Sequence, residues 1–127
     1  MEQVITKKKV LIVDDEPNVR RLSRTILSKK FDIVEAEDGR QALEIASTQQ
    51  PDVILMDMMM PRIDGLTACH LIKKDPITKS IPVIMVTAIS FELNIKLSQQ
   101  MGASAYVTKP FSPKELLDKI MLVLQTA

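Results

Sequence analysis

Hydrophobic residues occur along the chain in two alternating patterns, short unbroken runs and longer stretches with helical spacing. Unbroken runs rich in β-branched residues are typical of strands buried on both faces, whereas apolar residues three or four positions apart form one stripe of a helix. The expected strands are residues 10–13, 31–36, 53–56, 81–86 and 105–107. Because a helical pattern follows each run, the sequence predicts an α/β fold, a parallel sheet with helices on both faces.

Capping and turn residues indicate where the helices begin and end. Pro17 suits the first turn of a helix, because its missing N–H needs no partner there. Asp38 is a candidate N-cap, and the pair 64–65 (Asp-Gly) indicates a turn. Gly102 is expected to end a helix over residues 91–101. The first helix is predicted to bury one stripe, formed by Val19, Leu22, Ile26 and Leu27.

Composition limits the class of protein. The 127 residues are 46% hydrophobic and 26% charged, so we expect one domain over residues 1–127 with its core at about 8–124. A net charge of +1 and an aromatic content of 3% argue against direct nucleic-acid binding. No apolar run approaches the ~20 residues of a membrane span. Cys69 has no second cysteine to pair with, so we expect a cytoplasmic protein.

Polar residues follow four of the expected strands at the point where each strand ends. Asp14 and Asp15 follow the first strand, and Asp57 follows the third. Thr87 ends the fourth strand, and Lys109 comes directly after the fifth. Since ligand sites of open parallel sheets lie beyond the carboxyl ends of the strands, we expect these side chains to converge at one edge.

The charges of this set indicate its chemistry. Two carboxylates 4 Å apart repel by about 4 kcal/mol at an effective dielectric of 20, so protons or a cation must relieve them. Carboxylate oxygens suit Mg²⁺, a hard ion that keeps part of its water shell. A phosphoryl group could then be bound by Lys109 and Thr87, with Asp57 as a carboxylate nucleophile.

Four segments stand out as motifs: 11–17 (LIVDDEP), 57–65 (DMMMPRIDG), 86–88 (VTA) and 109–111 (KPF). Together they resemble the motifs of a known family, the receiver domains of two-component response regulators. The resemblance extends over about 8–124, with the motifs in the right order at strand ends. It implies a flavodoxin-like fold similar to the single-domain chemotaxis regulator, with five strands in the order 2-1-3-4-5 flanked by five helices.

The resemblance also implies a role for each site residue. Asp57 would accept the phosphoryl group from a histidine kinase or a histidine phosphotransfer protein. Asp15 would bind Mg²⁺ directly and Asp14 mostly through water, with Asp57 and the Met59 backbone carbonyl completing the protein ligands. Thr87 would be the switch hydroxyl, Lys109 would bind the phosphoryl group, and Tyr106 would be the aromatic switch. The peptide bond before Pro110 would be cis. Such a domain catalyses only its own phosphorylation and dephosphorylation, and it signals to a downstream protein or a linked effector.

Other functions remain as alternatives. A Mg²⁺-dependent aspartyl-phosphate hydrolase needs a second carboxylate two residues after the nucleophile, where this chain has Met59. A flavodoxin-like cofactor binder needs a Gly/Ser/Thr-rich phosphate loop after the first strand, where this chain has Asp14, Asp15 and Glu16. A silent pseudo-receiver that only binds partners stays open. Either a single-domain regulator or a fragment of a longer regulator fits the chain.

Some residues have an ordinary structural reading beside a functional one. The methionines at 56 and 58–60 could suggest a soft-metal site, but packing around the acidic cluster is the better interpretation. Cys69 and His70 lack ligand spacing and are interpreted as structural or surface residues. Tyr106 could be only a half-buried strand residue. Arg40, Lys73 and Lys74 are predicted to be solvated.

The fourth and last helices are more apolar than one buried stripe requires. The residues concerned are Ile89, Phe91, Leu93, Ile95, Leu97, Leu116, Leu117, Ile120, Met121 and Leu124. Two interpretations remain open: a face that binds a partner or a second copy of the chain, and a wide stripe facing the core. Met59 and Ile89 also lie two residues after Asp57 and Thr87, where large apolar groups could slow hydrolysis of an acyl phosphate.

Overall fold

A five-stranded parallel sheet forms the centre of the molecule, in a computed structural model that describes residues 7–88 and 92–126. The strand order β2-β1-β3-β4-β5 confirms the predicted topology. The strands are β1 (Lys9–Val13), β2 (Asp32–Ala36), β3 (Val53–Met56), β4 (Val83–Thr87) and β5 (Ala105–Thr108). β1 lies between β2 and β3, so the chain reverses its direction of winding there, at the switch point where ligand sites form.

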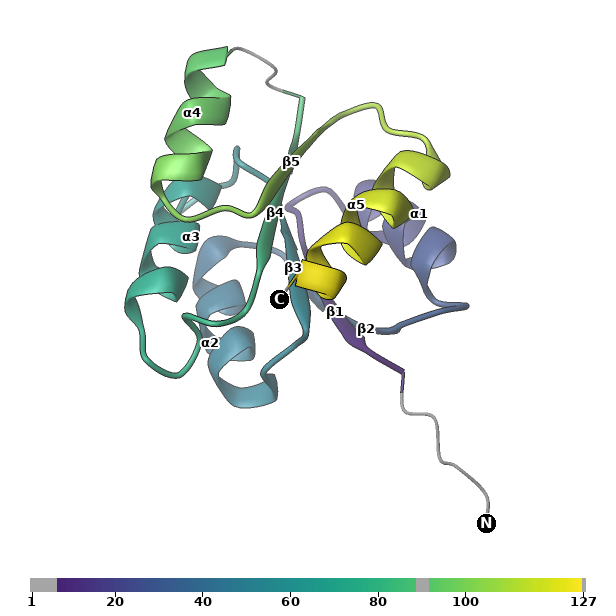
Figure 1. The fold of residues 1–127 in the computed structure, drawn as a ribbon, viewed down its shortest axis with the longest axis horizontal. Helices are drawn as coiled ribbons and strands as arrows, with labels where there is room; N and C mark the ends of the chain where they lie inside the picture. The colour runs from purple at the N-terminus through teal and green to yellow at the C-terminus, as the bar shows by residue number, and fades with distance from the viewer. Residues whose placement is uncertain (1–6, 89–91, 127) are drawn as a thin grey trace.

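Helices cover both faces of the sheet, as the alternating pattern predicts (Figure 1). They are α1 (Pro17–Leu27), α2 (Gly39–Gln49), α3 (Gly65–Lys74), α4 (Glu92–Gln100) and α5 (Pro113–Thr126). Figure 1 shows α1 and α5 on one face and α2, α3 and α4 on the other. Because successive side chains of a strand point to opposite faces, Leu11 and Val13 pack in one buried cluster and Val10 and Ile12 in the other.

The predicted stripe of α1 is wrong at one position. Leu22 is 54% exposed, whereas Ser23 is 4% exposed and occupies the centre of the buried side. The side that faces the sheet runs through Val19, Ser23, Ile26 and Leu27, a spacing of four, three and one residues. Leu22 lies about 80° from the middle of that stripe, since each residue turns a helix by about 100°.

The pair at 64–65 is not a turn between elements but the start of α3. The Asp64 carboxylate accepts a hydrogen bond of 2.9 Å from the Thr67 backbone N–H and caps the helix. Gly65 is the first helical residue, and a Cβ there would come within 2.0 Å of the Asp57 carbonyl oxygen. Glycine is therefore required by the close approach of two backbones.

Lys73 departs from the prediction that it is solvated. Its ammonium donates hydrogen bonds to the carbonyls of Ile81 (2.5 Å) and Lys79 (3.2 Å), and burial lowers its pKa. Arg40 and Lys74 are exposed, as predicted. Within the described residues, the helices are too short or too polar for any of them to cross a membrane.

Candidate functional site

Three side chains from distant parts of the sequence meet at the carboxyl edge of the sheet. Asp14 follows β1, Asp57 follows β3 and Lys109 follows β5. The Lys109 ammonium lies 2.6 Å from Asp14 Oδ2 and 3.6 Å from Asp57 Oδ2. Both carboxylates are buried, at 3% and 5% exposure, so solvent screens this charge triad only weakly.

Backbone hydrogen bonds between neighbouring strands place these residues. The Asp57 N–H donates to the Val13 carbonyl at 2.9 Å, which extends the β1–β3 pairing by one step. The Lys109 N–H donates to the Thr87 carbonyl at 2.8 Å and extends the β4–β5 pairing in the same way. The site residues are therefore continuations of the sheet, and their positions follow from its register.

Further bonds orient the two carboxylates. Asp14 Oδ1 accepts from the Glu16 backbone N–H at 2.9 Å, and the Asp14 carbonyl accepts from Arg20 Nη1 at 2.5 Å. Asp57 Oδ1 accepts from the Met59 backbone N–H at 3.4 Å. Arg20 is in turn paired with Glu35 of β2 at 3.2 Å, so α1 and β2 both support the loop that carries Asp14.

Burial and neighbouring charges shift the ionisation of this group. Burial raises the pKa of Asp57 to about 6, and the Asp14 carboxylate adds to the rise while Lys109 opposes it. Burial disfavours the charged form of Lys109, but its hydrogen bond to Asp14 and the charges of Asp14 and Asp57 hold its pKa above the ordinary value. At neutral pH Asp57 is therefore mostly ionised and Lys109 keeps its positive charge.

The donor set at this edge fits a hard divalent cation. Carboxylate oxygens of Asp14, Asp15 and Glu16 lie within 4.8 Å of one another, with Asp14 buried and the other two exposed. Burial is the main cause of the raised pKa of Asp57, and the charges of Asp14 and Asp15 add to the rise, so a cation at this edge would relieve their repulsion. Mg²⁺ prefers such oxygen ligands and keeps several waters, which the exposed side of the cluster can accommodate. Glu16 is not among the ligands that the sequence analysis predicts, although its position directly after Asp14 and Asp15 indicates that its carboxylate could join the cluster.

The remaining predicted residues lie around this centre. Thr87 ends β4 with 1% exposure, and Tyr106 is half-buried on the neighbouring strand β5, opposite Met85. Burial raises the pKa of Tyr106. The Lys109–Pro110 peptide bond is cis. Met59 is 64% exposed, and its backbone lies beside Asp57 through the N–H contact already described.

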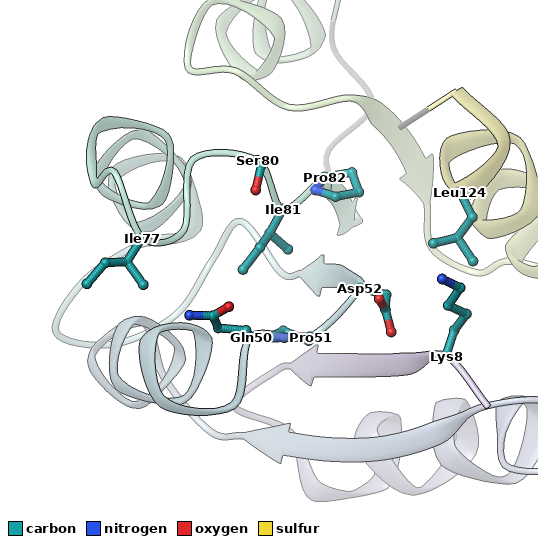
Figure 2. A pocket seen from close by; sticks show the side chains of 9 residues that line it. All are labelled: Lys8, Gln50, Pro51, Asp52, Ile77, Ser80, Ile81, Pro82 and Leu124. Atoms are coloured by element: carbon teal, nitrogen blue, oxygen red, sulfur yellow. The ribbon is translucent and has the colours of Figure 1, made fainter. Parts of the chain in front are cut away.

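A pocket lies at the opposite edge of the sheet, where the strands begin (Figure 2). It has a volume of about 300 Å³ and is bordered by segments that lead into β1, β3 and β4. Figure 2 labels Lys8, Asp52, Ser80 and Leu124 among its lining residues. None of the predicted site residues lines this pocket, so it is separate from the cluster of Asp14, Asp57 and Lys109 at the carboxyl edge.

The sulfur-containing residues have structural surroundings. Met56 and Met58 are buried in the core cluster beside α2 and α3, and Met59 is exposed, which supports the packing interpretation. The Cys69 thiol is fully buried and donates to the Met101 carbonyl at 3.5 Å. Burial raises its pKa to about 11, so the thiol stays protonated at neutral pH.

The fold is that of a flavodoxin-like α/β protein, and its carboxyl edge carries an acidic cluster. Residues 10–121 match the model of the response regulator receiver domain, and the chain belongs to that family. It is therefore a receiver domain of two-component signal transduction. It is 44% identical over 121 residues to "Probable transcriptional regulator ycf27" of Guillardia theta, covering 94% of this chain and 46% of that protein. The chain spans about half the length of the curated relatives it matches.

Solved structures agree with this assignment. A response regulator of Chloroflexus aurantiacus superimposes with a TM-score of 0.90 at 30% identity, covering 94% of this chain and 99% of that one. The receiver domain of a sensor histidine kinase from Pseudomonas aeruginosa gives a TM-score of 0.87 at 27% identity, covering 94% and 99% of the two chains. That structure contains a magnesium ion coordinated in its active-site cleft. A receiver related to this chain therefore binds Mg²⁺, and this chain has an acidic cluster at its own carboxyl edge.

Proposed function

We propose that this receiver domain accepts a phosphoryl group on Asp57 and changes its partner-binding face in response. The observation that carries the proposal is the position of Lys109, whose ammonium lies between the buried carboxylates of Asp14 and Asp57 at 2.6 and 3.6 Å. A buried nucleophilic carboxylate beside an ammonium and an acidic cation site is suited to phosphoryl transfer.

The transfer follows from the charges of the site. The Asp57 carboxylate would form the new bond to phosphorus while the bond to the donor atom breaks, and that electron pair leaves with the donor. With a pKa of about 6, Asp57 is mostly ionised at neutral pH and available as a nucleophile. Lys109 would bind a phosphoryl oxygen. Mg²⁺ held by Asp14, Asp15, Asp57 and the Met59 carbonyl would supply positive charge that neutralises the phosphoryl group.

Thr87 and Tyr106 would convert the modification into a change of shape. A phosphoryl group adds up to about two negative charges and three strong acceptors. The Thr87 hydroxyl, at the end of β4, would bond to one of them, and Tyr106 on β5 would repack against the displaced loop. Moving an equilibrium from 1:99 to 99:1 needs about 5.5 kcal/mol, which a few charge-assisted bonds of about 1.5–3 kcal/mol each can supply.

The donor would be a histidine kinase or a histidine phosphotransfer protein, as expected for a two-component receiver, and the signal would pass to a downstream protein or a linked effector. We expect the domain to act without binding nucleic acid or membrane itself. Any reaction it catalyses would be confined to its own phosphorylation and dephosphorylation, with Mg²⁺ as cofactor.

The face formed by α4, β5 and α5 is our candidate for self-association. A groove of about 620 Å³ there is lined by Ile95, Tyr106 and Leu122 among others. Leu93 and Leu122 are 68% and 54% exposed. Its lining also carries both signs of charge, on Glu115, Asp118 and Lys119, so the acidic residues of one copy can pair with the lysine of a second copy across a two-fold axis. Parts of the predicted apolar surface belong to the core instead, since Leu116 and Ile120 are fully buried, and Ile89 and Phe91 lie outside the described residues.

Leu93→Ser tests this face, with Leu71→Ser on α3 as a matched control because Leu71 is also exposed, at 41%. Self-association is measured by light scattering with and without beryllofluoride, a phosphoryl mimic. We expect Leu93→Ser to weaken a dimer that the mimic promotes, and Leu71→Ser to leave it intact. A wild-type protein that stays monomeric in both states would contradict the proposed dimer.

The test of the phosphoacceptor is the intact mass after incubation with acetyl phosphate. We expect a gain of one phosphoryl group that requires Mg²⁺ and is absent from Asp57→Asn. No gain in a protein with an intact fold by circular dichroism would leave a silent pseudo-receiver, and Asp57 would have no acceptor role. A gain that persists in Asp57→Asn would place the acceptor elsewhere.

A further inference from the structure

The loop between β3 and α3, residues 58–64, is closed at its base by the backbone. The Gly65 N–H donates to the Met58 carbonyl at 2.9 Å. A Cβ at Gly65 would come within 2.0 Å of the Asp57 carbonyl oxygen, so the end of the loop lies directly on the peptide of the proposed phosphoacceptor. The loop also carries the Met59 carbonyl, which is the proposed backbone ligand for Mg²⁺.

The middle of the loop is fastened to a different element, the start of α2. Arg62 Nη1 donates to Asp38 Oδ2 at 2.7 Å, while Asp38 Oδ1 accepts from the Gln41 N–H at 2.9 Å as the cap of α2. The Asp38 side chain is 6% exposed and Arg62 is 64% exposed. Next to this pair the two backbones touch, because a Cβ at Gly39 would come within 2.4 Å of the Ile63 carbonyl oxygen.

Arg62 holds this contact from an unfavourable backbone conformation. Its φ is +68°, in the left-handed region that glycine and asparagine adopt more readily than arginine does. The course of the loop imposes this backbone conformation, and it directs the Arg62 side chain to the start of α2. The Arg62 side chain forms a charged hydrogen bond to the second oxygen of the buried Asp38 carboxylate.

The segment that receives Arg62 also supports Asp14. The Ala36 carbonyl, at the end of β2, accepts from the Asp14 N–H at 3.2 Å, two residues before the Asp38 cap. The β2–α2 turn therefore contacts the Asp14 loop on one side and the Met59 loop on the other. We propose that Arg62 is a positioning residue of the phosphoacceptor site: through Asp38 it holds the β3–α3 loop, and with it the Met59 carbonyl, in place for Mg²⁺. This inference rests on the proposed function.

The proposal predicts the opposite sign from simple electrostatics. Removing a positive charge near an acidic cation site strengthens cation binding by reducing long-range repulsion. Releasing the loop weakens cation binding, because the loop must then be ordered when the ion binds. A fall in Mg²⁺ affinity on removal of Arg62 is therefore evidence for positioning and against a charge effect.

The experiment compares variants of the whole chain in a Mg²⁺ titration by calorimetry. Arg62→Ala removes the ion pair, and Arg62→Gly removes it while also relieving the backbone at φ +68°. Asp38→Asn keeps a residue that caps helices well but removes the charge that Arg62 binds. Arg40→Ala is the control, because it deletes an exposed arginine one residue after Gly39 on the same helix.

We expect Arg62→Ala, Arg62→Gly and Asp38→Asn each to lower Mg²⁺ affinity by about tenfold, the lower end of the range for residues that support metal ligands from outside the coordination sphere. The double variant Arg62→Ala with Asp38→Asn should be no weaker than the single variants, because one interaction is lost in each case. Arg40→Ala should bind Mg²⁺ as tightly as the wild type or more tightly.

A second readout needs no metal. Amide hydrogen exchange at residues 59–64 in the metal-free protein should be faster in Arg62→Ala and Asp38→Asn than in the wild type and Arg40→Ala, since the fastened loop opens less often. Unchanged Mg²⁺ affinity and unchanged exchange in folded Arg62 variants would overturn the positioning role. A wild-type protein that binds no Mg²⁺ and gains no phosphoryl group would overturn the proposed function itself.

Discussion

Replacing Asp57 by asparagine should stabilise the metal-free protein at neutral pH. The folded protein holds the Asp57 carboxylate at 5% exposure, and burial together with Asp14 raises its pKa from 3.8 to about 6. One pKa unit corresponds to about 1.4 kcal/mol, so the charged form costs the folded state about 3 kcal/mol at pH 7. Asparagine resembles the protonated carboxyl group and avoids that cost.

The effect has a defined pH window. Between about pH 4 and pH 6 the folded state binds more protons at Asp57 than the unfolded state does, so the stability contributed by this group falls as pH rises. The destabilisation is complete above the folded-state pKa of about 6 and absent below the unfolded-state value of 3.8. The advantage of Asp57→Asn should therefore be largest above pH 6 and disappear below about pH 4.

Urea unfolding in the presence of EDTA measures this difference. Circular dichroism is the suitable signal, because the chain has no tryptophan. We expect Asp57→Asn to raise the free energy of unfolding by about 3 kcal/mol at pH 7.5, while Asp32→Asn, at an exposed position, changes it by less than about 0.5 kcal/mol. An Asp57→Asn protein that is no more stable than the wild type at pH 7.5, or a difference that is independent of pH, would refute the reasoning.

Three further predictions concern metal binding, backbone contact and phosphoryl lifetime. Mg²⁺ at 100 times the wild-type Kd should raise the free energy of unfolding of the wild type by about 2.7 kcal/mol, and EDTA should reverse the change. At the same Mg²⁺ concentration the increase should be smaller in Asp57→Asn, because one carboxylate ligand has lost its charge. Gly65→Ala should lower the free energy of unfolding by about 3 kcal/mol or more, since its Cβ would lie 2.0 Å from the Asp57 carbonyl oxygen. A urea midpoint equal to that of the wild type would contradict this contact. Met59→Asn should shorten the phosphoryl half-life, because we expect the large apolar side chain two residues after Asp57 to hinder the attacking water. Decay of the phosphorylated mass with time measures the half-life, and equal or slower decay in the variant would disprove this role.

Much of the candidate site follows from local patterns in the sequence. The buried runs predict the strands, the alternation of runs and helical stretches predicts the parallel sheet, and the carboxyl ends of such strands share one edge. Asp14, Asp57 and Lys109 could therefore be assigned to a common edge without coordinates, and the structure places them within 3.6 Å of Lys109 Nζ. The sequence also predicts that Asp38 caps a helix and that Gly102 ends α4, because capping depends on adjacent residues.

What local pattern cannot supply is the partner of a side chain on another element. From the sequence alone, Arg62 would be interpreted as a surface loop residue. Its hydrogen bond to Asp38 joins residues 24 positions apart and forms only because α2 packs beside the loop. Leu22 looks like part of a buried stripe, yet the orientation of α1 on the sheet leaves it in solvent. Gly65 resembles a turn signal, but the backbone of Asp57 decides its role.

The charge state of the site is another property that local sequence patterns cannot supply. The sequence by itself determined which ionisable groups gather at the edge, because periodicity sets the strands and strands set their ends. Only the tertiary structure decided that Asp57 is buried beside Asp14 with its pKa at about 6, and that the Lys109 ammonium lies nearer to Asp14 than to Asp57. The reason is physical: burial and Coulomb energy depend on distances between segments, and those distances are fixed by how the helices pack on the sheet.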